Sequence, residues 1–337
     1  LAKGKLENIL TANSLTARYL NKQKNIRYSS AKYLDKNGIK IECAFANNLK
    51  NITLNIPVNG LIVVSGVSGS GKTSLVFDVL HESAKAKKPI NCQVISGLGQ
   101  FNNIIAFDSS AIGQSSISNV LTYTGLFTAI RDIFANTSAA KKQNLGKKHF
   151  SFNQKGGRCE TCQGQGRIKI SMDFLSDVYV ECEDCKGKRF SHEVLACKYD
   201  GKTIFDILEM TIEEGLEFFN ASQKLHKSLS TLCETGLSYI KMGQSLNTFS
   251  GGEVQRLKLA NILISSKAGR NLFLMDEPTT GLHFHDVNQL LKIIERLISE
   301  GHSVIMVEHH PDIIRNADWL IELGPEGGDG GGRVLRG

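Results

Sequence analysis

The segment GVSGSGKT, residues 66–73, has the residue types and the spacing of a phosphate-binding loop. It matches G-x-x-x-x-G-K-[ST] at every defined position. The glycines let backbone N–H groups turn toward an anion, the lysine reaches the β- and γ-phosphates, and the hydroxyl after it ligates Mg²⁺. An apolar run precedes the segment and a helix-forming run follows it, which distinguishes such a loop from a chance glycine-rich turn. We therefore predict ATP binding by Gly66, Ser68, Gly69, Gly71, Lys72, Thr73 and Ser74.

Two acids and a histidine follow other apolar runs. Asp276 and Glu277 come directly after NLFLM, and His309 comes shortly after VIMV. The carboxyl ends of parallel strands meet at one edge of a sheet, so these side chains are expected to face one nucleotide. We predict that Asp276 ligates Mg²⁺ together with Thr73. Glu277 is the predicted catalytic base and His309 the predicted γ-phosphate contact, although strand-end polar residues can also be plain surface residues.

A second anion cradle is predicted at FSGGEVQR. Ser250, Gly251 and Gly252 open a predicted helix over residues 250–264, and a helix N-terminus with a hydroxyl group and N–H groups attracts phosphate. One nucleotide does not need two such cradles in one subunit. We therefore expect two ATPase modules to pair head to tail, with this cradle completing the ATP site of the partner module.

Four cysteines form two C-x-x-C pairs with nineteen residues between them. This spacing is typical of a closed, structural zinc site, while a redox C-x-x-C or four core cysteines are the alternatives. Between the pairs, polar and apolar residues alternate over 167–174, and we expect a hairpin that turns at 175–177 and returns over 178–180. The predicted zinc ligands are Cys159, Cys162, Cys182 and Cys185.

Lysine and arginine are unevenly distributed along the chain. The net charge is +7, and residues 141–158 contain six Lys or Arg and no acid. Such clusters favour a polyanionic partner, although a solvated basic face gives the same pattern. Because contacts to phosphates carry no base information, we expect a polyanion such as duplex DNA to be bound with low sequence preference. The predicted DNA-binding residues flank the hairpin: Lys141, Lys142, Lys147, Lys148, Lys155, Arg158, Lys186, Lys188 and Arg189.

The sequence lacks the features of a membrane or secreted protein. No apolar run of about 18 residues occurs, and the opening LAKGKLENIL has no apolar secretory core. Eight cysteines in 337 residues do not form the dense pattern of a disulfide scaffold. We expect a cytoplasmic location and no membrane partner, and the missing initiator Met suggests a fragment or a processed form.

Elements that could position these residues alternate along the chain. Predicted strands precede the loop at 66, the acids at 276 and the histidine at 309, and predicted helices lie between them. This order is typical of an α/β fold with a parallel sheet covered on both faces. The helix over 285–300 carries an apolar stripe that ends at Gly301, and the tail GPEGGDGGG is expected to be mobile or a series of tight turns.

These motifs together resemble the C-terminal half of the UvrA family, the damage sensors of bacterial nucleotide excision repair. The resemblance covers residues 45–330 through GVSGSGKTSL, FSFNQKGGRCETCQGQG, DVYVECEDCKGKRF, NTFSGGEVQRLKLA, MDEPTTGLH, VEHHPDII and ADWLIELGPEGG. It implies an ABC-type P-loop ATPase core with a helical signature domain that carries a zinc-bound β-hairpin insertion. The implied cofactors are ATP, Mg²⁺ and Zn²⁺. The implied partners are damaged duplex DNA and a second ATPase half or a second copy, but not a UvrB-type helicase, which the other half binds.

The resemblance also sets domain limits and shows departures. We expect a discontinuous ATP-binding core at 1–88 and 265–337, and a signature domain at 89–264 with the hairpin insertion at about 156–190. Ser109 stands where the family has a Gln that senses γ-phosphate, and Gln114 stands where it has an Arg. A diverged paralogue with weak ATPase activity, acting in DNA binding or regulation, is therefore the alternative function. A transporter ATPase is a third reading, which the cysteine insertion and the basic run disfavour.

Overall fold

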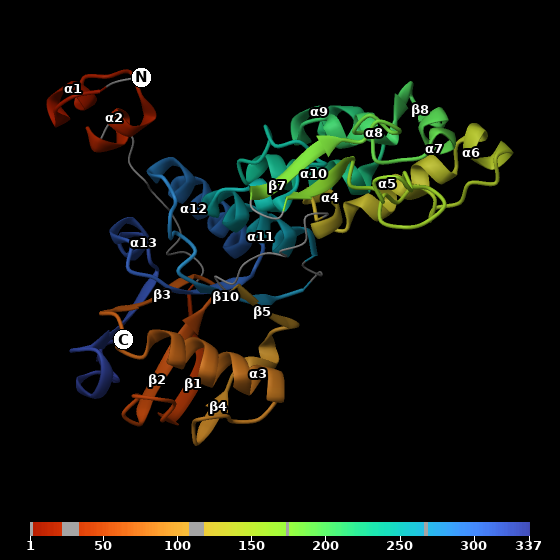
Figure 1. Cartoon of the computed structure of the whole chain (residues 1–337). Coiled ribbons are helices and arrows are strands. Elements are labelled where there is room, and N and C mark those ends of the chain that lie inside the picture. Colours follow the sequence, from red (N-terminus) through yellow and green to blue (C-terminus); the bar gives the residue numbers. More distant parts are fainter. Residues whose placement is uncertain (1–2, 22–33, 108–117, 173–174, 266–268) are drawn as a thin grey trace. The chain divides into compact units, whose positions relative to one another are not determined.

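The chain forms two compact units in the computed structural model (Figure 1), which describes residues 3–21, 34–107, 118–172, 175–265 and 269–337. One unit comprises residues 1–110 and 265–337, and the other comprises 111–264. Residues 89–110, which the sequence analysis placed in the signature domain, group with the first unit. The reason is strand pairing, since β4 (Val94–Ser96) joins β1 (Asp35–Ala44) and β5 (Asn103–Phe107) joins β10 (Asn271–Asp276).

A six-stranded sheet organises the first unit. Its order is β13-β12-β3-β11-β10-β5, and every neighbouring pair is parallel except β12 with β13. The strands not yet given are β3 (Leu61–Gly66), β11 (Ser303–Val307), β12 (Trp319–Gly324) and β13 (Arg333–Arg336). β10 is buried up to Met275 and β11 throughout, as expected for parallel strands covered on both faces. The predicted α/β class with a parallel sheet is confirmed.

A second, antiparallel sheet and several helices complete this unit. The sheet has the order β2-β1-β4, with β2 at Ile52–Val58. A π-helical segment, η1 (Ser74–His81), follows the phosphate-binding loop, and its apolar side chains share one core with both sheets. The remaining helices are α1 (Leu6–Leu10), α2 (Leu15–Leu20), α3 (Glu82–Ala86), α12 (Phe284–Ser299) and α13 (Pro311–Arg315). The predicted apolar stripe of α12 is buried along its length.

Helices dominate the second unit, and they enclose a separate apolar core. A capping box begins α9 (Ile212–Phe218), because Thr211 and Glu214 exchange hydrogen bonds of 2.8 and 3.1 Å. The other helices are α4 (Val120–Tyr123), α5 (Leu126–Ala135), α6 (Ser138–Lys142), α7 (His192–Ala196), α8 (Ile204–Glu209), α10 (Gln223–Glu234) and α11 (Gly251–Ser265). A short pair of strands, β8 (Lys198–Tyr199) and β9 (Lys202–Thr203), lies between α7 and α8. No helix of the described segments is long and apolar enough to cross a membrane.

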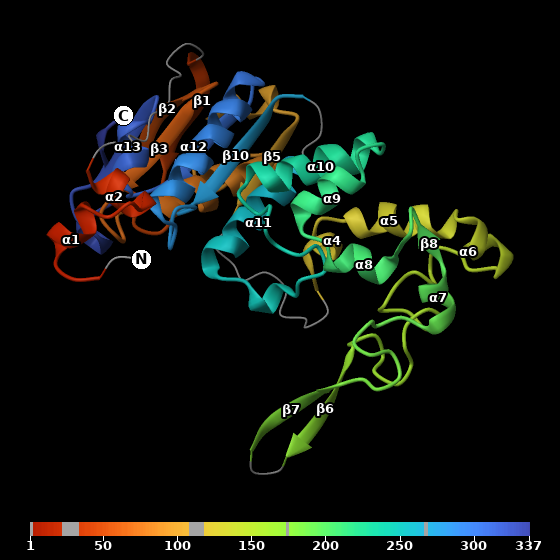
Figure 2. The same ribbon diagram turned by 90° about the horizontal axis from the view of Figure 1, so that it is seen from above.

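An antiparallel hairpin extends from the helices of the second unit (Figure 2). Its strands are β6 (Arg167–Met172) and β7 (Leu175–Glu181). The hairpin prediction is confirmed, but the turn predicted at 175–177 is wrong, because β7 already begins at Leu175. Cross-strand contacts explain this: Asp177 accepts a hydrogen bond from Ser171 at 3.1 Å and pairs with Lys169 at 2.6 Å.

Candidate ATP and metal sites

The phosphate-binding loop lies between the end of β3 and the start of η1, as its sequence predicts. Lys72 is buried, and its Nζ donates to the carbonyl oxygens of Gly66 and Val67 at 3.0 and 2.8 Å. Burial lowers the pKa of Lys72, while the carboxylates of Glu277 and Asp276 oppose that shift. Lys72 is therefore directed inside the loop, with two acids near enough to affect its charge.

The acids and the histidine lie at the same edge of the sheet. The Thr73 hydroxyl is 3.5 Å from Oδ1 of Asp276, so both oxygens can reach one divalent cation. Nδ1 of His309 lies 3.8 Å from Oε1 of Glu277, and both side chains are substantially exposed. Glu277 has a left-handed backbone with φ 43°, which is uncommon for a residue other than glycine and is concentrated at functional sites. Residues from the ends of β10 and β11 thus gather beside the loop that follows β3.

A buried carboxylate that the sequence analysis missed connects two of these strand ends. Glu308 follows β11 and is fully buried. One of its oxygens accepts hydrogen bonds from the backbone N–H and the hydroxyl of Thr279, in the loop after Glu277. The other accepts from the N–H groups of His309 and His310 at 2.9 and 3.1 Å. The sequence contained a signal for this role, since Glu308 directly follows an all-apolar strand. A carboxylate at such a buried place needs several hydrogen-bond donors.

The SGGE segment belongs to the second unit. Its helix, α11, begins at Gly251, and Ser250 caps it. The N–H and the hydroxyl of Ser250 both donate to Glu253, at 2.8 and 3.0 Å, and the Glu253 N–H is 3.4 Å from the Ser250 oxygen. These contacts form a reciprocal capping box. Ser250 is exposed, and the space around Gly251 is open, since an added Cβ would meet no atom within 4 Å.

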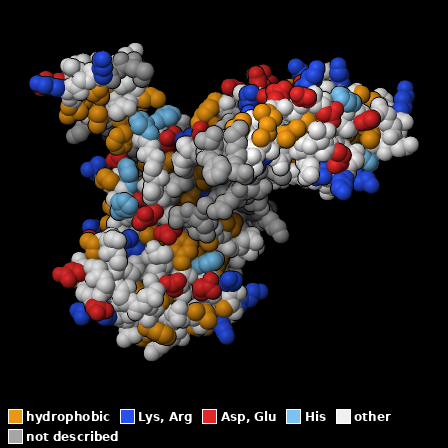
Figure 3. All heavy atoms as spheres, in the orientation of Figure 1, with side chains coloured by type: hydrophobic (Ala, Val, Ile, Leu, Met, Phe, Trp, Pro, Cys, Tyr) orange, Lys and Arg blue, Asp and Glu red, His pale blue; other side chains and the backbone are white. Residues whose placement is uncertain are grey.

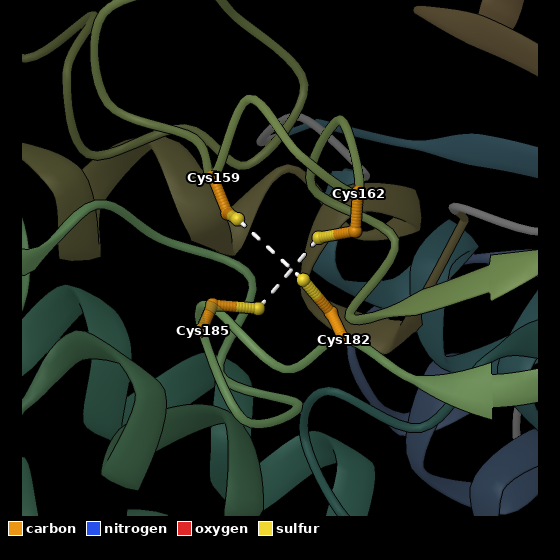
Figure 4. Close-up of side chains that lie close together, drawn as sticks. All are labelled: Cys159, Cys162, Cys182 and Cys185. Atoms are coloured by element: carbon orange, nitrogen blue, oxygen red, sulfur yellow. Dashed lines mark hydrogen bonds between the residues drawn. The ribbon is translucent and has the colours of Figure 1, made fainter.

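The two cysteine pairs converge at the base of the hairpin (Figure 4). The four Sγ atoms lie within 4.8 Å of one another, and all four residues are buried. Two of the sulfur–sulfur distances are 3.9 Å, for Cys159 with Cys182, and 3.6 Å, for Cys162 with Cys185. Thiolates at about 2.3 Å from a tetrahedral Zn²⁺ lie about 3.8 Å apart. The four sulfurs therefore fit a closed, four-coordinate structural Zn²⁺ site.

The surroundings of the sulfurs affect how they bind a metal ion. Burial raises the pKa of the Cys185 thiol to about 12, so a metal ion that binds there displaces a proton. The N–H of Gly166 points at Sγ of Cys162 from 3.2 Å, which is an outer contact typical of metal-bound thiolates. A four-cysteine cluster that fits zinc is thus part of the fold.

The predicted DNA-binding residues divide into two groups. Lys141, Lys142, Lys148, Lys155, Lys186 and Lys188 are exposed. Figure 3 shows basic side chains at the end of the second unit that carries α6. The others have structural contacts: Lys147 pairs with Asp132 at 2.7 Å, Arg158 with Glu160 at 3.2 Å, and the Arg189 guanidinium lies 5.2 Å from the centre of the Phe152 ring.

The hairpin has one charged face and one apolar face. Register pairs Arg167 with Glu181 and Lys169 with Tyr179, and these four residues line a groove of about 910 Å³. The groove is completed by Lys186, Gly187 and Arg189, by α8, and by four residues between Gly243 and Thr248, shortly before the SGGE segment. The opposite face consists of exposed Ile168, Ile170, Val178 and Val180.

Comparison with known proteins identifies the family. The family model described as ABC transporter matches residues 159–280. UvrABC system protein A from Vibrio cholerae is 46% identical over 345 residues, covering 99% of this chain and 37% of the relative. The protein of the same name from Staphylococcus epidermidis is 48% identical over 329 residues, covering 96% and 35%. The crystal structure of UvrA2 from Deinococcus radiodurans has a TM-score of 0.86 at 37% identity, covering 98% of this chain and 41% of that one. The chain is an ATPase module of the UvrA family.

The resemblance drawn from the motifs is therefore confirmed, together with the ABC-type ATPase fold. The chain spans a little over a third of the length of the curated UvrA relatives that it matches. The family's γ-phosphate-sensing position, where this chain has Ser109, and the nearby Gln114 lie outside the described residues.

Proposed function

We propose that the first unit binds ATP with Mg²⁺ and hydrolyses it. The proposal is carried by the convergence of Lys72, Asp276, Glu277 and His309 at the end of the sheet beside the phosphate-binding loop. Lys72 pairs with the β- and γ-phosphates, while Thr73 and Asp276 hold the cation, which neutralises charge on the phosphates. Glu277 orients the attacking water, and His309 contacts the γ-phosphate.

The proposed ATP site is completed by a second module. Ser250, Gly251 and Gly252 offer an exposed helix N-terminus that can receive phosphate from a partner. The partner is a second ATPase half or a second copy of this chain. A UvrB-type protein is not among the partners that we propose for this half.

We propose that the second unit contacts duplex DNA during damage recognition. The relatives are named for the UvrABC system, and the six exposed lysines that flank the hairpin in the sequence offer phosphate contacts. Phosphate contacts give low sequence preference, so that deformability of the duplex can be detected instead. A cytoplasmic location agrees with four reduced cysteines held by Zn²⁺.

One experiment tests both parts. ATP turnover is measured over a range of protein concentrations, with undamaged and with damaged duplex DNA. We expect activity per molecule to rise with protein concentration, because the site is composite, and damaged duplex to change the rate more than undamaged duplex does. Turnover that stays flat down to concentrations at which the protein is monomeric would contradict the composite site.

The same turnover measurement, combined with the affinity for duplex DNA, addresses the alternative function. Ser109 replaces the γ-phosphate-sensing Gln, which favours a paralogue that binds DNA with weak turnover. Tight duplex binding with a rate that damaged DNA does not alter would support that alternative and contradict coupled damage sensing.

A further inference from the structure

The glycine-rich segment 327–332, which we call the glycine collar, packs against the phosphate-binding loop. The N–H of Gly328 donates to the Gly69 carbonyl oxygen at 3.0 Å, and the N–H of Gly332 donates to that of Ser70 at 3.2 Å. Asn48 joins the two segments, because its Nδ2 donates to the Gly69 oxygen at 2.8 Å and to the Gly328 oxygen at 2.9 Å. Two carbonyl groups of the loop are thus held by residues from both ends of the first unit.

Close approach to other backbone segments explains Gly327 and Gly332 of the collar. A Cβ on Gly327 would lie 2.5 Å from the Ser68 carbonyl oxygen, and one on Gly332 would lie 1.9 Å from that of Asn48. Gly332 also has φ 75°, which side chains other than glycine rarely adopt. Of the two expectations for this tail, the tight turn is the one observed, since Gly328–Gly330 form a 3₁₀ turn.

Holding a carbonyl also orients the N–H group of the next residue. In a planar trans peptide the C=O and the following N–H point in opposite directions. Because the Ser70 oxygen is bonded to the collar, the Gly71 N–H is directed away from the collar. The Gly66 and Val67 oxygens are not bonded to the collar but accept from Lys72 Nζ. Lys72 is also the residue that must turn to the phosphates when nucleotide binds. The collar bonds do not have to break for that step.

We propose that the glycine collar and Asn48 are positioning elements that preset the phosphate-binding loop for nucleotide. The proposal rests on the ATP binding proposed above. It assigns to the C-terminal glycine run a role in nucleotide affinity and none in the chemical step, because the hydrogen bonds described above for the collar and Asn48 go to the phosphate-binding loop and to the collar itself.

The test uses Asn48→Asp and Asn48→Ala in the full chain. Aspartate keeps the size of the side chain but replaces the donating amide by a carboxylate that repels both carbonyl oxygens, whereas alanine only removes the donor. Asn55→Ala is the matched control. Asn55 lies on strand β2, and its Nδ2 also donates to a backbone oxygen, that of Lys36 on β1, at 2.8 Å. The readouts are the dissociation constant for a non-hydrolysable ATP analogue with Mg²⁺, turnover at saturating ATP, and thermal unfolding.

We expect the dissociation constant to rise about tenfold for Asn48→Asp, equivalent to about 1.4 kcal/mol, and less for Asn48→Ala. Turnover at saturation should change less than about twofold, because the catalytic groups are untouched. A folded Asn48→Asp that binds the analogue as tightly as Asn55→Ala would overturn the proposal. So would a loss of folding in both Asn48 variants, which would make Asn48 a residue of fold stability. If the unaltered protein itself binds no nucleotide, the proposed ATPase function is wrong. The collar proposal alone is wrong if the unaltered protein binds nucleotide and Asn48→Asp binds it equally well.

Discussion

Glu308→Gln tests whether one buried carboxylate holds the catalytic loops in place. The substitution keeps the size of the side chain and one oxygen, but it replaces the other oxygen by an amide that donates. Whichever way the amide is turned, two donors lose their acceptor. These are either the N–H and hydroxyl of Thr279 or the N–H groups of His309 and His310.

The magnitude follows from those four hydrogen bonds. A hydrogen bond to a charged group contributes about 1.5–3 kcal/mol, so losing two costs about 3–6 kcal/mol if nothing moves. Movement of the loops toward water reduces this cost, and the same movement displaces His309 and Glu277. We therefore expect the free energy of unfolding to fall by about 3 kcal/mol and turnover at saturating ATP to fall at least about tenfold. ATP affinity should change less than about threefold, because Lys72 is untouched.

The assay is phosphate release over an ATP titration, combined with thermal unfolding of the same samples. Glu322→Gln is the control, because Glu322 is an exposed acid on strand β12 of the same sheet. It should leave both turnover and unfolding unchanged. If Glu308→Gln turned over ATP at the unaltered rate and unfolded at the unaltered temperature, the four contacts would not position the catalytic groups, and the reasoning would be refuted.

Three further predictions concern the other sites. Cys182→Ser should reduce zinc from one atom per chain to none by metal analysis and disorder the hairpin, while nucleotide binding persists because the first unit has its own core; zinc retained in this variant contradicts the four-cysteine site. Glu277→Gln should bind ATP normally and lose turnover by at least about a hundredfold, and residual turnover near the original rate would exclude it as the base. Replacing Lys148 and Lys155 together by alanine should lower the slope of log affinity for duplex DNA against log salt by about two units, and an unchanged slope in folded protein would show that neither lysine contacts phosphate.

Sites made of residues close in sequence could be predicted, because local spacing defines their geometry. GVSGSGKT occupies eight consecutive residues, and each C-x-x-C pair is one tight turn. Alternation also predicted that a hairpin lies between the two pairs, but not its register, because a shift by two residues leaves the alternation unchanged. The buried face of α12 could be predicted for the same reason, because residues three and four positions apart lie on one face of a helix.

Contacts between distant residues could not be predicted in this way. Glu308 meets Thr279 from 29 residues away, and Asn48 meets Gly328 from 280 residues away. Nothing local distinguishes Asn48 from its neighbour Asn47, although one of them bonds to the collar and the other to Ser74 and Asp78.

The two-faced hairpin limits how its strands can vary in evolution. Because side chains alternate along β6, deleting one residue between Arg167 and Ile170 would move isoleucine into the charged groove and lysine onto the apolar face. Removing two residues would preserve both faces. We therefore expect relatives to differ in the length of this hairpin by even numbers of residues, and a relative with an odd difference to carry a bulge that restores the alternation.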